Sequence, residues 1–393
     1  MQIVSVAHSY PRTDEEFAGV FVHRLNVALR ARKHAVKVVV PADRGDGTRD
    51  RRDGVGISRV RYAPARLETL AYKGTMAESA RTPIGAITAS SLMLAQAFEI
   101  RHLNRIAPID IVHAHWWVPG GVSAMLACAF RSLKYIVTLH GTDVAILRES
   151  GAARRLAKTV LKKAAAITAV SSYLADRAAD IAGIHPNRIT IQPMPIDVDR
   201  FDSLSRGGGG VVAIGRLIEQ KNLGLLLEAM AQLKQLGSNV RLRIIGDGPK
   251  REHLERRARG LGIQDSVRFV GAVPPDDIPG HLSDADVMVF PAIREGLGLV
   301  AAEALLMGVP VVATHMGGGV TDIVPPTGAG RLVPADDPHA MALAIRDLIT
   351  DRSSLARAAE TGRSLRRRLE PDAVARVFET VYQSALAGKT RRA

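Results

Sequence analysis

The feature that most constrains the fold is the alternation of short apolar runs with helix-like segments along the first half of the chain. The apolar runs, within residues 3–171, are IVSVAHSYP, HAVKVVVP, IDIVHAH, KYIVTLHG and AAAITAVS. Segments such as FVHRLNVALRARK and SLMLAQAFEIRHLNRI lie between them. Apolar strands that alternate with helices are typical of a parallel sheet with covered faces. The first half is therefore predicted to be a Rossmann-like domain.

The same alternation starts again after four glycines at 207–210. New apolar runs follow as GVVAIGR, VRLRIIGDG, VRFVGAV, ADVMVFPA and PVVATH. The glycines have the composition of a linker. We therefore expect an α/β protein with two Rossmann-like domains, over 1–200 and 209–370, that face a central cleft. Residues 371–393 are expected to form a C-terminal helix and tail, which could pack on either domain, including the N-terminal one.

Cysteine content and the N-terminal sequence favour a cytoplasmic location. The chain has one cysteine, Cys128, and its first residues lack the basic and apolar regions of a secretory signal. The uncharged stretches 82–98 and 111–130 resemble membrane spans, but polar residues, proline or glycine interrupt both. We expect a protein that is soluble or peripheral to a membrane.

The positive charge is unevenly distributed. The net charge is +14, of which the first 200 residues carry +11. Three clusters contribute to it: Arg30, Arg32 and Lys33; Arg49, Arg51 and Arg52; and Arg154, Arg155, Lys158, Lys162 and Lys163. This field favours an anionic partner for the first domain, and we predict an acidic membrane surface at the inner face of the membrane rather than nucleic acid. The alternatives are a soluble phosphorylated acceptor and cations that serve only solubility.

Two cations follow the first strand of the second domain. Arg216 directly follows Gly215, Lys221 stands five residues further on, and a helix is expected to begin near Asn222. Two positive side chains and a helix N-terminus at the carboxyl end of a strand can hold a diphosphate. The alternative is a pair of solvated cations.

Two glutamates flank a glycine-rich turn in REGLGLVAAEALLMG. A helix expected from Gly298 to Met307 places Glu303 roughly 7 to 8 Å along the axis from Glu295. Between them lie the backbone N–H groups of Gly296, Leu297, Gly298, Leu299 and Val300. Such N–H groups bind phosphate oxygens, and carboxylates accept hydrogen bonds from sugar hydroxyls, so the motif indicates a nucleotide-sugar site. The alternative is a surface glutamate and a helical ion pair.

Together these motifs resemble the retaining glycosyltransferases of family 4, group 1 enzymes with the GT-B fold. The resemblance runs through AIGRLIEQKN, RIIGDGP, VRFVGAVP and the glutamates, and in the first half through AGVFVHRLNVALRARKHAVKVVVP, HAHWWVPGG, TLHGTDV and AITAVSSYL. With PIDVDRF in the linker, it covers nearly the whole chain. The sequence departs from the family in having Leu297 where Phe is frequent, and Ala18 before Gly19 where a glycine pair is usual.

The resemblance implies a hexosyltransferase that retains the anomeric configuration and needs no metal or other cofactor. Its donor would be a nucleotide sugar, such as a UDP- or GDP-sugar. Its acceptor would be a hydroxyl of a glycan, a lipid-linked molecule or a small molecule, as in the synthesis of cell-envelope polysaccharides. Two rivals remain: a nucleotide-sugar 2-epimerase of the same fold, and a non-catalytic basic protein that binds membrane or nucleic acid.

The resemblance also implies roles for residues of the second domain. Arg216 and Lys221 would bind the donor diphosphate and stabilise its charge. Glu295 would hold the hydroxyls of the transferred sugar, and Glu303 would bind the ribose. The nucleotide base would meet backbone groups from Gly271 to Val273.

In the first domain the implied donor-site residues are fewer. Gly19 would approach the phosphates, and His140 and Asp143 of the HGTD motif would face the sugar and the reaction centre. No metal site is predicted. The DxD triplet of Asp197 and Asp199 belongs to the linker pattern, and the histidines of IDIVHAH lack nearby cysteine or acidic partners.

Overall fold

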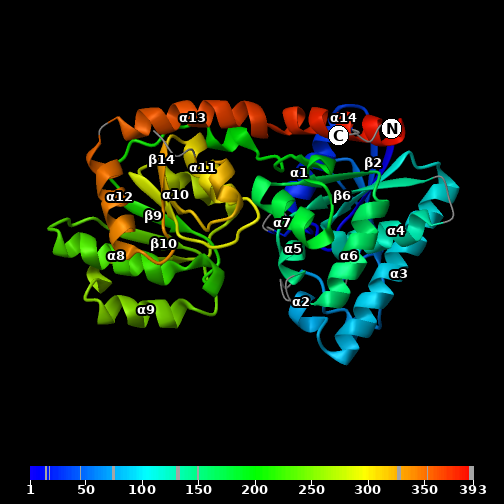
Figure 1. Cartoon of the computed structure of the whole chain (residues 1–393), viewed down its shortest axis with the longest axis horizontal. Helices are drawn as coiled ribbons and strands as arrows, with labels where there is room; N and C mark the ends of the chain where they lie inside the picture. The colour runs from blue at the N-terminus through cyan, green and yellow to red at the C-terminus, as the bar shows by residue number, and fades with distance from the viewer. Residues whose placement is uncertain are drawn as a thin grey trace. The chain divides into compact units, whose positions relative to one another are not determined.

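The computed structural model describes residues 1–13, 16, 18–44, 46–72, 76–129, 133–147, 150–324, 329–351 and 353–388. The chain forms two compact units. Unit 1 comprises Met1–Pro195 and Pro371–Ala393, and unit 2 comprises Ile196–Glu370. Each has one sheet, in agreement with the two Rossmann-like domains expected from the sequence (Figure 1).

The boundary between the units differs from the sequence prediction. The second domain was expected from Gly209, whereas unit 2 begins at Ile196. The glycine run is not a free linker, because the N–H groups of Gly208 and Gly210 donate to the two carboxylate oxygens of Asp286, at 2.6 and 2.8 Å. The backbone N–H of Ile196 also donates to the carbonyl of Leu369, at 3.0 Å. These bonds join the segment to unit 2.

Unit 1 has an eight-stranded sheet in the order β3-β4-β2-β1-β5-β6-β7-β8. Only the pair β3 and β4 is antiparallel. The strands are β1 (Gln2–Val6), β2 (Ala35–Pro41), β3 (Arg49–Arg52), β4 (Val55–Val60), β5 (Ile111–His115), β6 (Lys134–Leu139), β7 (Ala166–Ala169) and β8 (Ile189–Ile191). Strands β1 and β5 are almost wholly buried, as their apolar sequences predict.

Helices cover the sheet of unit 1. They are α1 (Val20–Ala31), α2 (Met76–Ser79), α3 (Pro83–Ile106), α4 (Val122–Cys128), α5 (Thr142–Ile146), α6 (Gly151–Lys163), α7 (Ser172–Ala182) and α14 (Pro371–Leu386). The start of α3 has a strong signal, because the hydroxyl of Thr82 accepts a hydrogen bond from the N–H of Gly85 and Pro83 occupies the first turn.

Helix α3 covers the first of the two uncharged stretches, residues 82–98. Within the described residues it is the one helix long and apolar enough to cross a membrane, judged by length and composition alone. Polar residues interrupt the stretch, which argues against a span. In the structure 33% of its most apolar window is buried against the unit.

The C-terminal helix α14 belongs to unit 1 and contacts α1 (Figure 1). Arg32 pairs with Asp372 at 2.7 Å and with Glu379 at 2.9 Å, and His34 bonds to Glu379 at 2.6 Å. Beneath them, Tyr382 is fully buried. The sequence left open which domain this helix joins; the tail beyond Gly388 lies outside the described residues.

Unit 2 has a six-stranded parallel sheet in the order β11-β10-β9-β12-β13-β14. The strands are β9 (Val211–Ile214), β10 (Leu242–Ile245), β11 (Val267–Gly271), β12 (Val287–Phe290), β13 (Val311–Thr314) and β14 (Gly330–Val333). The helices are α8 (Leu223–Gln235), α9 (Arg251–Gly260), α10 (Ile278–Leu282), α11 (Leu299–Leu306), α12 (Pro338–Thr350) and α13 (Ser354–Leu369). The apolar stripe of α8 is buried in a core shared with α12 and β9.

Candidate active site

In unit 2 the predicted cations lie on the loop between β9 and α8. Strand β9 ends at Ile214, and Arg216 follows as an exposed side chain. A short 3-10 turn over Glu219–Lys221 then leads into α8. The loop therefore presents both cations at the carboxyl edge of the sheet, where open parallel sheets bind ligands.

Lys221 and Glu295 form an ion pair at this edge. The ammonium nitrogen of Lys221 lies 2.7 Å from Oε1 of Glu295, and the two side chains are only 18% and 20% exposed. The same nitrogen lies 5.2 Å from the centre of the Phe290 ring. The pair thus brings together two of the residues that the sequence assigned to one donor site.

Backbone hydrogen bonds hold the loop of Glu295 in place. The N–H of Ile293 donates to the carbonyl of Gln220, at 2.9 Å, which ties this loop to the one that carries Lys221. Glu295 itself donates to Gly317 and accepts from Gly319, at 3.1 and 3.0 Å. Between these contacts stands Gly318, whose φ is 77° and whose Cβ, if present, would lie 2.2 Å from the carbonyl oxygen of Glu295. Only glycine fits there, because a side chain would displace Glu295.

The glycine-rich turn leads directly into α11. Gly298 precedes the helix with a φ of 81°, and α11 begins at Leu299 and continues with Val300. Leu297 is buried, so the leucine that replaces the family's phenylalanine is a packing residue. Glu303 is a half-buried residue in the second turn of α11, on the same helix that the sequence predicted to carry it.

The neighbouring strands end close to the same loop. The carbonyl of Gly271, at the end of β11, accepts a hydrogen bond of 2.7 Å from Gly246. Gly246 in turn packs directly against the backbone of Gly215. Gly271 and the half-exposed Val273 therefore lie along the carboxyl edge that also carries Arg216.

In unit 1, Gly19 is the residue that precedes α1. Its φ is 79°, and a Cβ would lie 2.4 Å from the carbonyl oxygen of Ser9. This close approach of two backbones explains why the position needs glycine. The predicted contact of Gly19 with a phosphate stays a prediction.

His140 lies at the carboxyl end of β6 within a cluster of rings. Its Nε2 is 3.1 Å from Nδ1 of His115, and its ring centre is 4.4 Å from that of Trp116 and 5.1 Å from that of Phe21. Burial holds the pKa of His140 well below its usual range, and the nearby His115 lowers it further. His140 is therefore a neutral hydrogen-bonding group at pH 7.

Asp143 organises the loop that carries His140. Its carboxylate accepts hydrogen bonds from the N–H groups of His140, Gly141, Val144 and Trp117, at 2.9 to 3.2 Å. Burial raises its pKa, and the four N–H groups act in the opposite direction. Asp143 thus has both oxygens engaged by backbone, which makes it a positioning residue rather than a group free to hold a sugar hydroxyl.

The other histidine of strand β5, His113, is also part of the core. His113 is fully buried, and its two nitrogens lie 2.9 Å from the Tyr382 hydroxyl and 2.7 Å from Oγ1 of Thr138. Neither nitrogen is available to a metal. Across the parts of the chain that the structure describes, no three His, Cys, Asp or Glu side chains are grouped to hold a metal ion.

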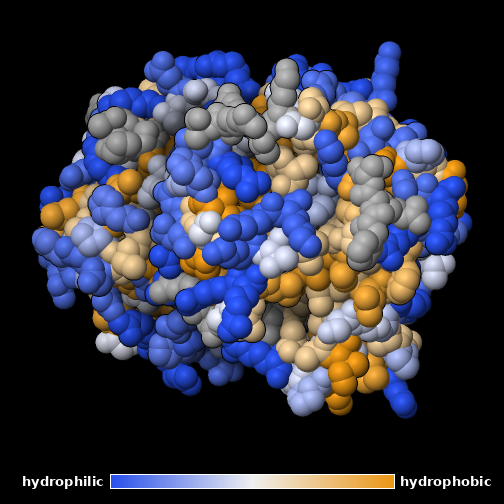
Figure 2. Space-filling model, turned by 45° about the vertical axis from the view of Figure 1, so that its right-hand side comes forward, coloured by the Kyte–Doolittle hydropathy of each residue, from blue (hydrophilic) through white to orange (hydrophobic). Residues whose placement is uncertain are grey.

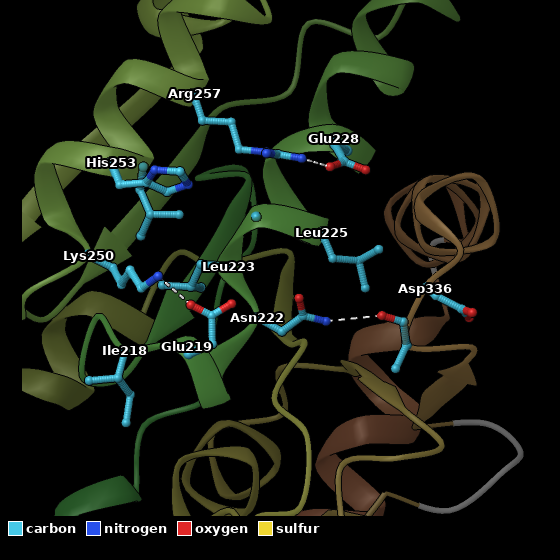
Figure 3. Close-up of a pocket in the computed structure, with 13 residues that line it drawn as sticks. Ile218, Glu219, Asn222, Leu223, Leu225, Glu228, Lys250, His253, Arg257 and Asp336 are labelled. Atoms are coloured by element: carbon cyan, nitrogen blue, oxygen red, sulfur yellow. Dashed lines mark hydrogen bonds and ion pairs between the residues drawn. The ribbon is translucent and has the colours of Figure 1, made fainter.

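A separate hollow of about 330 Å³ lies beside the loop between β9 and α8 (Figure 3). Four of its charged side chains form two ion pairs, Lys250 with Glu219 and Arg257 with Glu228. Figure 3 shows these pairs on facing elements of the hollow. Lys221 is not among the lining residues. The hollow is therefore distinct from the edge that carries Lys221 and Glu295.

The family follows from comparison with known proteins. Residues 18–200 match the model described as Glycosyltransferase Family 4, and residues 197–365 match the model described as Glycosyl transferases group 1. The chain belongs to the group 1 glycosyltransferases. This confirms the resemblance drawn from the motifs, and with it the expectation that the chain is a glycosyltransferase enzyme.

Relatives and solved structures support the same assignment for this glycosyltransferase. It is 29% identical over 301 residues to the GDP-mannose-dependent alpha-(1-6)-phosphatidylinositol monomannoside mannosyltransferase of Mycolicibacterium smegmatis, with 70% of this chain and 77% of the relative covered. Sucrose-phosphate synthase from Thermosynechococcus elongatus superposes with a TM-score of 0.79 at 22% identity, over 99% of this chain and 100% of that one. HepE from Anabaena in complex with UDP-glucose gives 0.72 at 19%, over 98% and 100%. The predicted GT-B fold is confirmed.

Reasoning from the sequence missed the neighbours of the assigned residues. Phe290 lies under Lys221, and His115, Trp116 and Phe21 surround His140. A signal was present, because Phe290 and His115 are the last residues of predicted strands and the carboxyl ends of parallel strands share one edge of a sheet. Phe21 had no such signal, since it lies inside a helix.

Proposed function

We propose that this glycosyltransferase moves a hexose from a nucleoside diphosphate sugar, such as a UDP- or GDP-sugar, to an acceptor hydroxyl, with retention of configuration and without a metal ion. The observation that carries the proposal is the pair of Lys221 and Glu295 at the carboxyl edge of the unit 2 sheet. The lysine offers a cation for the diphosphate, and the carboxylate beside it offers an acceptor for sugar hydroxyls.

Charge stabilisation is the main catalytic contribution in this proposal. Negative charge develops on the diphosphate as its bond to the sugar breaks, so groups that bind this charge most strongly in the transition state increase the rate. Lys221, held by Glu295 and half-buried, is such a group, and Arg216 is a second cation on the same loop. Two side-chain cations would take the place of a divalent ion.

Within a retaining reaction, the pairing of Glu295 favours direct transfer over a covalent glycosyl-enzyme intermediate. Its carboxylate is paired with the ammonium of Lys221, which reduces its strength as a nucleophile. The proposed reaction is therefore a transfer in which the acceptor hydroxyl attacks from the face that the diphosphate leaves. The bond between the sugar and the diphosphate breaks, and the departing diphosphate oxygen accepts the hydroxyl proton. His140, as a neutral imidazole, would hydrogen-bond to the sugar and not supply charge.

The proposed acceptor is a lipid-linked molecule at the cytoplasmic face of a membrane. The mycobacterial relative is named for a phosphatidylinositol mannoside acceptor. The first 200 residues of this chain carry a net charge of +11, which favours an anionic surface.

The test begins with the donor. A thermal-shift screen of UDP- and GDP-hexoses identifies it, because a ligand at 100 times its dissociation constant adds about 2.7 kcal/mol to the free energy of unfolding. Transfer to a polyprenyl-phosphate-linked sugar is then measured, and the anomeric configuration of the product is determined by NMR. We expect retention. An inverted product contradicts the proposed reaction, and a changed nucleotide sugar formed without acceptor identifies an epimerase.

A further inference from the structure

Helix α3 carries an apolar stripe on its outer side. Four large apolar side chains are exposed: Ile84 by 61%, Ile87 by 70%, Leu94 by 48% and Phe98 by 64%. They follow one another at intervals of three, seven and four residues, which places them on one face of a helix. In Figure 2 apolar side chains gather on the lower right of the surface, in the part of the molecule where Figure 1 places α3.

The opposite side of α3 is firmly attached to unit 1. Leu92, Ile100 and Leu103 are buried, and the side-chain amide of Gln96 donates to the carbonyl of Ala7, at 2.9 Å. These contacts determine which face points outward. They also oppose insertion of α3 across a membrane, because the helix would have to give up its core packing and its hydrogen bonds.

Basic side chains lie in the same layer of helices. Helix α4 contacts both α3 and α6, so the three helices are neighbours on one side of the sheet (Figure 1). Helix α6 contains no acidic residue, and five of its cations are exposed: Arg154, Arg155, Lys158, Lys162 and Lys163. An exposed apolar stripe on the same side of the sheet as a basic helix is the pattern of a surface that lies in the interface of an anionic bilayer.

We propose that the α3 stripe and the α6 cations dock this protein onto an anionic lipid bilayer, with the stripe lying in the headgroup region and not spanning the membrane. The inference rests on the proposed function, since it states how the enzyme reaches a lipid-linked acceptor. Each cation near an acidic surface strengthens binding, and the apolar side chains provide a second, salt-independent attraction.

Charge argues against a second copy of the chain as the occupant of the stripe. Pairing two stripes would bring two chains of net charge +14 together, with their α6 helices close to the contact. An anionic bilayer instead offers opposite charge to the same cations.

The test is sedimentation with vesicles of equimolar phosphatidylglycerol and phosphatidylcholine, compared with phosphatidylcholine alone, at low and high salt. We expect the protein to bind the anionic vesicles at least about 10-fold more strongly than the neutral ones. The variant I87S/F98S should reduce this binding about 10-fold at either salt concentration. The variant K158Q/K162Q should reduce it mainly at low salt. The matched control is Ile191→Ser, which changes another exposed apolar residue, 47% accessible, on β8 of the same unit.

Several outcomes would overturn the inference. These are equal or absent binding of the unaltered protein to both vesicle types, and unchanged binding by I87S/F98S. A third is a dimer in analytical ultracentrifugation that I87S/F98S converts to monomers, which would assign the stripe to a second copy. Transfer to a soluble acceptor without vesicles should be equal in the unaltered protein and in I87S/F98S, which shows that the variant is folded. If the unaltered protein lacks transfer but binds vesicles, the proposed function fails and the docking surface stands.

Discussion

The two units differ in the charge of the groups at the carboxyl edges of their sheets. In unit 1 the carboxyl edge bears His140, a half-buried ring whose pKa is too low for it to hold a proton at pH 7. In unit 2 the carboxyl edge bears Lys221 and Glu295, which are paired and about one fifth exposed. Burial without an opposite charge favours the neutral form, whereas pairing and partial exposure keep a charge. Unit 2 is thus suited to a diphosphate, and unit 1 to neutral hydroxyl groups.

The largest expected effect comes from removing the charge of unit 2. Lys221→Ala and Arg216→Ala should each lower kcat on the order of 100-fold, because each removes charge stabilisation that is strongest in the transition state. Turnover of the identified donor is the measurement, with circular dichroism to establish the fold. The matched control is Lys250→Ala, a cation of the neighbouring hollow that pairs with Glu219. Near-normal turnover in Lys221→Ala would remove the distinction between the units.

Acid should lower the free energy of unfolding through the buried neutral histidines of unit 1. Burial lowers the pKa of His113 to about 3, so between pH 6.5 and 3 the unfolded chain binds a proton that the folded chain does not. Above pH 6.5 this residue is neutral in both states and leaves the free energy of unfolding unchanged. As the pH falls from 6.5 toward 3, protonation of the unfolded chain lowers that free energy. At pH 5 this one residue should cost about 2 kcal/mol of the free energy of unfolding.

Urea denaturation at pH 7 and pH 5 measures this loss. His113→Gln keeps a hydrogen-bonding side chain that cannot titrate, so the difference between the two pH values should shrink. The exposed His102 offers the control substitution, His102→Gln. An unchanged pH dependence in His113→Gln would show that the acid sensitivity comes from other groups.

Within unit 2, substitutions of the two glutamates should have different effects. Glu303→Ala should weaken binding of the free nucleotide about 10-fold, since a hydrogen bond to a ribose hydroxyl contributes about 1 to 1.5 kcal/mol. Glu295→Ala should leave nucleotide affinity nearly unchanged and impair transfer and sugar discrimination. Isothermal titration with the nucleoside diphosphate and turnover assays distinguish the two. Full nucleotide affinity in Glu303→Ala would contradict the ribose assignment.

The smallest expected effect is that of chelation. Turnover should persist in excess EDTA, because Lys221 and Arg216 supply the positive charge that a divalent ion would otherwise supply. The assay is repeated after addition of magnesium or manganese. Activity that EDTA abolishes and either ion restores would show that the cations of unit 2 do not suffice.

Local patterns predicted the elements well. The stripe of α8, with Leu226 and Met230, is buried as expected, because 3.6-residue periodicity is a local property that burial on one face requires. The helix Pro371–Leu386 was also predicted from its spacing. Its place in unit 1 could not be predicted, since it depends on pairs such as Arg32 with Glu379, which are remote in sequence.

Composition misled where partners were remote. Glycines 207–210 have the composition of a linker, yet Asp286 binds two of their N–H groups and joins them to unit 2. Helix α3 is apolar on both faces in sequence, so periodicity alone did not indicate which face would be left outside. The Asp286 and Gln96 contacts that decide these questions are visible only in the folded chain.

The sequence by itself determined the two parallel-sheet units, the strand ends that carry Arg216 and His140, and the family. Strands, helices and turns follow from neighbouring residues, and parallel connections place strand ends at one edge. The tertiary structure alone decided the pairing of Lys221 with Glu295, the low pKa of His140 beside His115 and the exposure of the α3 stripe. These depend on distance and burial in space, which are set when segments far apart in the chain exclude water together.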